Sequence, residues 1–177
     1  MRLSLKVPRN ADVTPPRREL LEAAGRGVSN AVKRHLVAKD AATPPRGDMP
    51  KTGYYGDAAG SVTTGMEGEI AVVSIPKEGM SLHYYGGVVY PTNGHKALAI
   101  PQVAAVAGRR PAEIDPSRDK FALVWPKGEK TGTLRDKESG EVVYLLVAKA
   151  TIPKDETVLP TDAAMYDAAN AAMEAIL

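Results

Sequence analysis

Two of the three histidines lie in one stretch that is rich in tyrosine and glycine. This stretch, LHYYGGVVYPTNGHKALAIP, runs from residue 82 to residue 101 and contains His83 and His95. A zinc or non-haem iron site needs three or four ligands that converge at about 2 Å. His83 and His95 lack the close spacing that brings two histidines to one metal, and His35 lies far away in the sequence. We therefore expect no metal site and no cofactor.

Other catalytic arrangements find little support in the sequence. No serine lies in a G-x-S-x-G elbow, although spacing leaves open a triad assembled from distant residues. The segment GEKTGT at residues 128–133 lacks the spacing of a phosphate-binding loop and precedes a predicted strand, so we interpret it as a hairpin tip. The acidic pair Glu67 and Glu69 has an ordinary surface composition around it. We predict that the protein is not an enzyme.

Length and composition bound the remaining classes of protein. The chain has 177 residues, a net charge of +2 and no cysteine, which predicts one domain without disulfides or thiolate chemistry. The N-terminal residues have no apolar core typical of a signal peptide, and no segment approaches the roughly 18 apolar residues of a membrane span. We expect an intracellular or virion protein with no membrane contact.

The first regular element should be a long helix. Thr14 is the expected N-cap, and Pro15 would occupy the first helical position. Gly25 and Gly27 each weaken a helix by roughly 0.5 to 1 kcal/mol relative to alanine, which suggests that the backbone is closely approached there. The apolar stripe that should face the core comprises Leu20, Leu21, Ala24, Val28, Ala31, Val32 and Leu36. Opposite it lies a basic face, either solvated or in contact with phosphates or an acidic partner: Arg18, Arg26, Lys33 and Arg34.

A Pro- and Gly-rich segment separates this helix from the first strands. Residues 40–60 should form an extended loop that ends in a helical turn near residues 54–59. The segment SVTTGMEGEIAVVSIP then predicts two strands joined by a tight turn at residues 66–68. After it we expect a helical turn at residues 80–85, stopped by Gly86, and a strand–turn–strand unit around Asn93 and Gly94.

The second half of the chain predicts further strands and a closing helix. Residues 121–126 and 141–152 should pair antiparallel as a long hairpin arm, with a polar, turn-rich segment between them. Thr161 should cap a C-terminal helix, which would bury one face comprising Met165, Ala169, Ala172, Met173 and Ile176. The predicted fold class is α+β, with a mostly antiparallel β-sheet packed against an N-terminal and a C-terminal helix in a single domain.

A run of motifs between residues 20 and 110 resembles a family of tailed-bacteriophage and prophage proteins, the virion morphogenesis or tail completion type (tail terminator, neck). In that group a helix leads to a strand ending in Ser-Ile, then to a Tyr/Gly-Gly turn, then to a strand with a Leu-x-Ile-Pro motif. The matching residues here are Val73, Ser74, Ile75, Tyr85, Gly86, Gly87, Leu98, Ile100 and Pro101. The loop at residues 43–52 departs from the motif, and beyond residue 121 only the general pattern of hairpin and helix is shared.

The resemblance implies a structural role for the histidine-containing stretch. Gly86 and Gly87 would permit backbone geometry closed to other residues, while Tyr84, Tyr85 and the strand from Leu98 through Ile100 to Pro101 would build a sheet and its subunit contacts. Such proteins assemble at the head–tail junction as rings, so the implied partners are further copies in a hexamer, the tail-tube protein and a neck or head-completion protein, with DNA in the channel as a further candidate. The implied location is the virion, and the host cytoplasm during assembly.

A second hypothesis belongs to another class of function. The basic helix face of Arg18, Arg26, Lys33 and Arg34, together with Arg109 and Arg110, could bind nucleic acid. Binding of this kind would weaken steeply with added salt.

Overall fold

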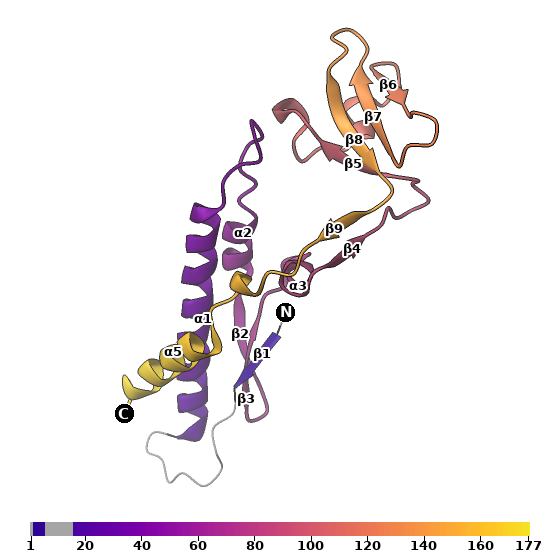
Figure 1. The fold of residues 1–177 in the computed structure, drawn as a ribbon. Helices are drawn as coiled ribbons and strands as arrows, with labels where there is room; N and C mark the ends of the chain where they lie inside the picture. Colours follow the sequence, from indigo (N-terminus) through magenta and orange to yellow (C-terminus); the bar gives the residue numbers. More distant parts are fainter. Residues whose placement is uncertain (1, 6–15) are drawn as a thin grey trace. The chain divides into compact units, whose positions relative to one another are not determined.

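The computed structural model describes residues 2–5 and 16–177, and its internal contacts divide the chain into two compact units (Figure 1). The helical unit comprises residues 1–43, 53–86 and 153–177, and the sheet unit comprises residues 44–52 and 87–152. The predicted α+β class is confirmed. The single-domain organisation stays a prediction, because contacts alone do not report whether the units unfold together.

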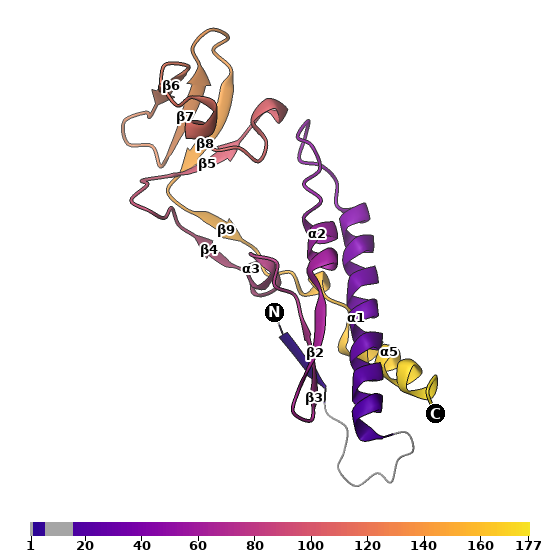
Figure 2. The same cartoon turned by 180° about the vertical axis from the view of Figure 1, so that it is seen from behind.

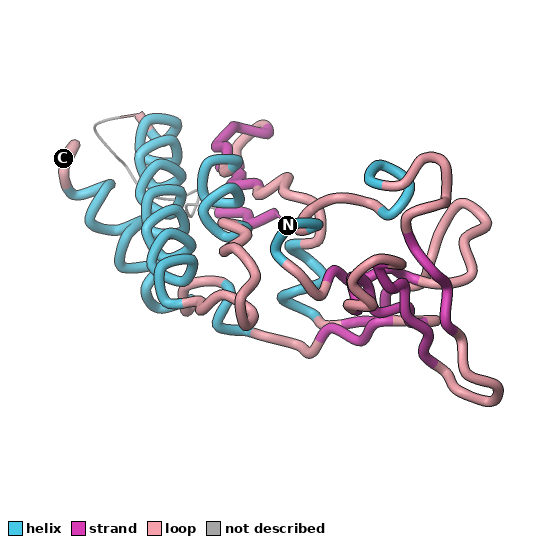
Figure 3. The backbone as a smooth tube through the Cα atoms, turned by 90° about the horizontal axis from the view of Figure 1, so that it is seen from above, coloured by secondary structure: helices cyan, strands magenta, loops and turns pink. Residues whose placement is uncertain are grey.

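The helical unit has one long helix between a small sheet and a second helix. The sheet is antiparallel, in the order β1-β3-β2. Figures 1 and 3 show this layering. The elements of the unit are β1 (Arg2–Leu5), α1 (Arg17–Ala42), α2 (Tyr54–Ser61), β2 (Thr63–Glu67), β3 (Ile70–Ser74), α3 (Met80–Tyr85), the 3-10 turn η2 (Glu156–Val158) and α5 (Asp162–Glu174).

The apolar stripe of α1 forms the centre of the core, as predicted. Val28, Val32 and Leu36 are at most 1% exposed and pack with residues from β3, α2, α3 and η2. Ala31, at the margin of the stripe, stays half-buried. The helix begins at Arg17, after Pro16, and the expected cap at Thr14 and Pro15 lies outside the described residues.

The two glycines of α1 allow close approach on opposite sides of the helix. A Cβ atom at Gly27 would lie 2.2 Å from the carbonyl oxygen of Ala168 on α5. One at Gly25 would lie 3.0 Å from Cγ2 of Thr64 on β2. The prediction of a close backbone approach at these glycines is therefore confirmed, and its partners are α5 and the sheet.

The remaining elements of the helical unit follow the predicted order with small shifts. β2 and β3 form the expected hairpin, but Met66 and Glu67 belong to β2, so the turn lies at Gly68 and Glu69. The predicted loop at residues 40–60 begins later than expected, because α1 continues to Ala42, and the helical turn expected near residues 54–59 is confirmed as α2. Thr161 caps α5 as predicted, and its side chain accepts a hydrogen bond from the Ala164 N–H.

The sheet unit contains a four-stranded antiparallel sheet and a two-stranded ribbon. The order of the sheet is β5-β8-β7-β6, and β4 pairs with β9 (Figure 2). Its small core comprises Val106, Phe121, Val143 and Tyr144. The elements of the unit are β4 (Gly87–Val89), β5 (Leu98–Pro101), the 3-10 turn η1 (Ala104–Val106), α4 (Pro111–Ile114), β6 (Phe121–Val124), β7 (Thr131–Asp136), β8 (Val142–Val147) and β9 (Ala150–Ile152).

The predicted pairing of the long hairpin is wrong. Residues 121–126 do not pair with residues 141–152, because β7 lies between β6 and β8. The long hairpin is present, but its strands are β7 and β8, so residues 131–133 belong to a strand and not to a tip. The ladder also breaks after residue 147, and β9 pairs instead with β4.

The expected strand–turn–strand unit is confirmed as an order of elements, but its two strands do not pair with each other. The turn at Asn93 and Gly94 is present, and both residues have the positive φ angles, 54° and 75°, that such a sequence favours. Its flanking strands pair elsewhere, however, β4 with β9 and β5 with β8. A turn signal reports the local backbone but does not report which strands will pair.

Candidate functional site

His83 belongs to an aromatic cluster in the helical unit. Its ring centroid lies 4.8 Å from that of Tyr54 and 5.8 Å from that of Tyr55. The His83 carbonyl oxygen accepts a hydrogen bond from the Asp155 N–H at 3.1 Å. His95 lies in an exposed turn of the sheet unit. Within the described residues, no group of three or more side chains is placed to hold a metal ion.

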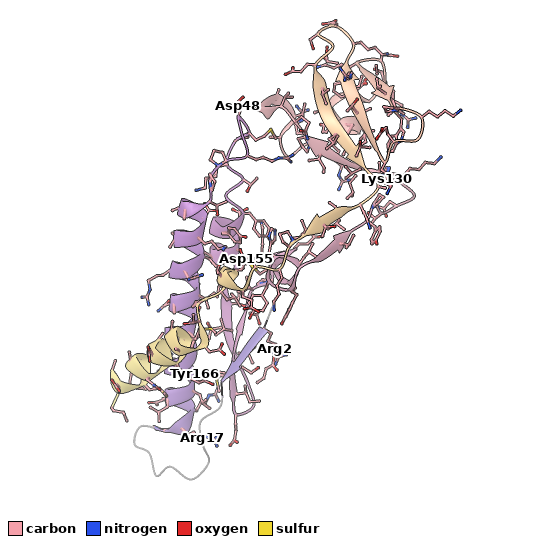
Figure 4. The ribbon with its side chains drawn as sticks, in the orientation of Figure 1. Arg2, Arg17, Asp48, Lys130, Asp155 and Tyr166 are labelled. Carbon is pink, nitrogen blue, oxygen red and sulfur yellow. The ribbon has the colours of Figure 1, made fainter. Side chains whose placement is uncertain are left out.

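Lys39, near the C-terminal end of α1, makes the polar contacts on one side of this aromatic cluster. Lys39 Nζ donates to Asp155 Oδ2 and to Thr157 Oγ1, both at 2.8 Å, and lies 5.5 Å from the Tyr55 ring centroid. His35 Nε2 is 2.8 Å from the Thr157 carbonyl oxygen. The Lys39 ammonium and the Thr157 hydroxyl lower the pKa of Asp155 to about 2. These contacts fix the chain that leads into α5 against α1 (Figure 4).

The other side of the cluster ties α2 to the segment before α3. The Tyr54 hydroxyl donates to the Glu78 carbonyl oxygen at 2.8 Å. Lys77 forms an ion pair with Asp57 at 2.9 Å and lies 5.5 Å from the Tyr54 ring centroid. Burial raises the pKa values of Tyr54 and Tyr55, so both stay neutral donors at physiological pH. The cluster therefore joins α2 to the segment before α3 through neutral tyrosine hydroxyl and ring contacts.

The predicted interface residues lie at the end of α3 and on β5, in different units. Tyr84 packs half-buried against the core of the helical unit, whereas Tyr85 is 63% exposed. Gly86 caps α3 with a φ of 73°, which explains why this position needs glycine, and Gly87 opens β4. The exposed Tyr85 ring is the part of this segment best placed for a partner.

Leu98, Ile100 and Pro101 lie on β5, at one edge of the four-stranded sheet. β5 pairs only with β8, and all of its residues are half-buried. Proline suits an edge strand because it has no N–H to donate to a neighbour. Leu98, Ile100 and Pro101 therefore build the sheet, as the resemblance implies, and leave one strand edge open.

The opposite edge of the same sheet carries apolar side chains that the sequence did not single out. On and next to β6, Leu123 is 63% exposed, Val124 40% and Trp125 41%. The Trp125 ring covers Gly132 of β7, where a Cβ atom would lie 2.3 Å from Trp125 Cε3. Exposed apolar edge strands are typical of surfaces that pair with another chain. The run FALVW was the available signal, but we assigned it to the long hairpin arm as the partner of residues 141–152 and did not consider the exposure of its side chains.

A buried carboxylate shapes the loop before β6. Asp115 is 6% exposed, and its two oxygens accept hydrogen bonds from the N–H groups of Asp119, Lys120 and Phe121 and from the Ser117 hydroxyl. Desolvation alone would raise the pKa of Asp115, but these donors outweigh it, and the pKa is lowered. Asp115 is thus a structural anchor of the sheet unit.

The basic residues of α1 differ in their pairing. Arg18 forms an ion pair with Glu22 at 3.0 Å. Among the described residues, no ion pair involves Arg26, Lys33 or Arg34. By sequence the sheet unit has twelve Lys and Arg against eight Asp and Glu, and the helical unit has eleven against thirteen. The two units therefore carry charge of opposite sign.

Comparisons with known proteins give no relative. No protein-family model, no curated protein and no solved structure matches the chain. In the part of the chain that the structure describes, no helix is both long and apolar enough to cross a membrane. Function has to be inferred from the residues themselves.

Proposed function

We propose that this protein is a structural subunit of a tailed-phage virion that forms a ring at the head–tail junction, where it caps the tail tube and joins it to the neck. The observation that carries the proposal is the motif run that resembles the tail completion family. Each part of it falls at an element boundary or on a strand: Ser74 ends β3, Gly86 and Gly87 separate α3 from β4, and Leu98–Pro101 is β5.

The burial of these residues supports an architectural reading of the motif. Val73 and Ile75 are at most 1% exposed and belong to the core of the helical unit. Gly86 adopts the left-handed backbone that a side chain disfavours. Residues that fix a backbone in this way are expected where a family shares an architecture.

Exposed apolar side chains on both units support a role in assembly. A monomeric soluble protein seldom exposes contiguous apolar patches, whereas a subunit of a larger assembly does. Leu123, Val124 and Trp125 are consecutive exposed residues of this kind on and next to β6, and the others that are more than half exposed are Val37, Tyr85, Tyr90, Tyr166 and Leu177. Within the described residues, neither edge of the four-stranded sheet pairs with a further strand.

The test is the mass of the purified protein in solution, measured by light scattering alone and with the tail-tube protein of the same phage. We expect a closed ring, sixfold by analogy with tail symmetry, either alone or on the tube. A protein that stays monomeric and does not bind the tube would contradict the proposal.

A second candidate is nucleic-acid binding, favoured by the charges of Arg26, Lys33 and Arg34, which form no ion pair with any residue that the structure describes. Phosphate contacts made by three such residues predict that the logarithm of the binding constant falls with the logarithm of salt concentration, with a slope of about −2 to −3. Fluorescence anisotropy with labelled duplex DNA at several salt concentrations measures this slope. A flat response would exclude contacts of this kind.

A further inference from the structure

The outer face of α1 has a polar stripe that no described element of the helical unit covers. Arg26, Asn30 and Val37 are exposed, Val37 by 56%, and Lys33 is half-buried. These four residues, the basic stripe, follow one another at intervals of four, three and four. Intervals of this kind keep side chains on one face of a helix, where a second helix can pack against them.

The outer face of α5 has a matching stripe of opposite charge. Ala163, Asp167, Asn170 and Glu174 are all exposed, because α5 faces α1 with Ala169, which is 3% exposed. These four residues, the acidic stripe, also follow one another at intervals of four, three and four. Tyr166 lies beside this stripe and is 64% exposed (Figure 4).

Neither stripe is used within the chain. Among the described residues, the six polar side chains of the two stripes make no hydrogen bond and no ion pair. Glu174 also lies at the C-terminal end of α5, where the helix dipole disfavours an acidic side chain. The stability of the isolated helix therefore does not explain why an acidic residue is present there.

We propose that the acidic stripe of α5 docks antiparallel on the basic stripe of α1 in a second copy of this chain. The equal spacing then places Arg26 opposite Glu174, Asn30 opposite Asn170, and Lys33 opposite Asp167. Val37 meets Ala163 beside the exposed Tyr166 ring, which gives the contact an apolar end. A polar Asn pair within such a seam fixes the register of the two helices.

This inference rests on the proposed ring and names the surfaces that would close it. Because α1 and α5 are different faces of one subunit, the contact is heterologous and can repeat from copy to copy around a ring. Charge attraction between exposed groups is screened by salt, so association should weaken as salt is added.

The test uses two charge-reversal variants and their mixture. Asp167→Lys with Glu174→Lys makes the acidic stripe basic, and Arg26→Glu with Lys33→Glu makes the basic stripe acidic. In either variant alone both attractive pairs become repulsive, so we expect the dissociation constant of self-association to rise about tenfold or more. An equimolar mixture should restore association, because every junction in an alternating ring is again attractive.

A matched control for the acidic-stripe variant keeps its change in net charge and moves that change to the sheet unit. Glu138→Lys with Glu141→Lys alters two exposed residues whose side chains take no part in the proposed contact. Far-UV circular dichroism checks that each variant folds, and rescue on mixing would be impossible for an unfolded chain. The control should associate like the natural protein.

The outcomes separate this inference from the proposed function. Association that is lost in each variant and restored in the mixture supports the contact, even if the tail-tube protein does not bind. Association that is unchanged by reversal overturns the contact while the ring can stand. A natural protein that is monomeric with and without the tube protein overturns both.

Discussion

The two units hold their parts together by different means. In the helical unit, α1 meets α5 and the sheet through glycine, alanine and β-branched residues, so steric fit fixes the elements. In the sheet unit, the core is small, and a buried aspartate and a tyrosine hydroxyl make directed hydrogen bonds. We therefore expect the stability of the helical unit to fall most when volume is added, and the stability of the sheet unit to fall most when a polar atom is removed.

The largest expected effect is that of Gly27→Ala in the helical unit. In an open helix this change stabilises by about 1 kcal/mol. Here the new Cβ would lie 2.2 Å from the Ala168 carbonyl oxygen and 2.8 Å from the Ala172 Cβ, so α5 must move. We expect the free energy of unfolding to fall by about 2 kcal/mol or more, as for other overpacked cores. Chemical denaturation followed by far-UV circular dichroism measures it.

The corresponding change in the sheet unit removes an atom instead of adding one. Tyr144 is 0% exposed, and its hydroxyl donates to the Arg109 carbonyl oxygen at 3.1 Å. Tyr144→Phe leaves that acceptor without its partner, and we expect a loss of about 1.5 kcal/mol. Trp125 is the only tryptophan and lies in the sheet unit, so its fluorescence reports unfolding there.

The same two probes decide whether the units are independent. Helix content reports mainly on α1 and α5, and Trp125 fluorescence reports on the sheet unit. Coincident transitions in denaturant would mean one cooperative domain. If Tyr144→Phe moves the fluorescence transition and leaves the circular dichroism transition in place, the single-domain prediction is wrong.

A smaller effect on stability is expected for Asp155, which forms an ion pair with Lys39 in the helical unit. The pKa of Asp155 is about 2, below its unfolded value of about 3.9, so its contribution to stability is present above pH 4 and is lost as the pH falls towards 2. Because the carboxylate is partly exposed, solvent screening limits this contribution to about 1 kcal/mol. Asp155→Asn should therefore be less stable at neutral pH and lose less stability on acidification.

The quantity to compare is the difference in stability between the natural protein and Asp155→Asn at each pH. Asp115 and Asp136 also have lowered pKa values, but both are present in the natural protein and in the variant. Thermal unfolding at pH 7, 4 and 2.5 measures the difference. A gap between the two proteins that stays constant across this range would contradict a role for the Asp155 charge.

Helices and local turns could be predicted from the sequence, whereas strand partners could not. The stripe of α1 and the cap at Thr161 are local signals, and both lie where they were expected. β7 was missed because Thr131, Gly132 and Thr133 follow a lysine- and glycine-rich stretch that resembles a turn. Pairing of β4 with β9 joins residues more than sixty positions apart, and no local pattern reports it.

In the candidate site, too, contacts between residues far apart in the sequence could not be predicted. A structural role for His83 was expected from the resemblance, and Tyr54 and Tyr55 lie in α2, where a helical turn was predicted, but no local pattern indicated that these three rings would meet. The Lys39–Asp155 pair was missed because its members are 116 positions apart. A local signal for Asp155 existed, since an aspartate two residues before a threonine is typical of a capped turn, and Asp155 accepts from the Thr157 N–H.

The smallest expected effect on stability is that of Gly60→Ala, which tests whether the close packing of α5 makes Gly27 intolerant of a methyl group. Gly60 lies in α2, has nothing within 4 Å of the position where a Cβ atom would lie, and is exposed. Gly60→Ala adds the same methyl group as Gly27→Ala, but it only reduces the freedom of the unfolded chain, so we expect a gain of about 0.5 kcal/mol. The two substitutions should therefore have opposite signs in one denaturation experiment. If both stabilise the protein, α5 does not pack on Gly27, and the steric account of the helical unit fails.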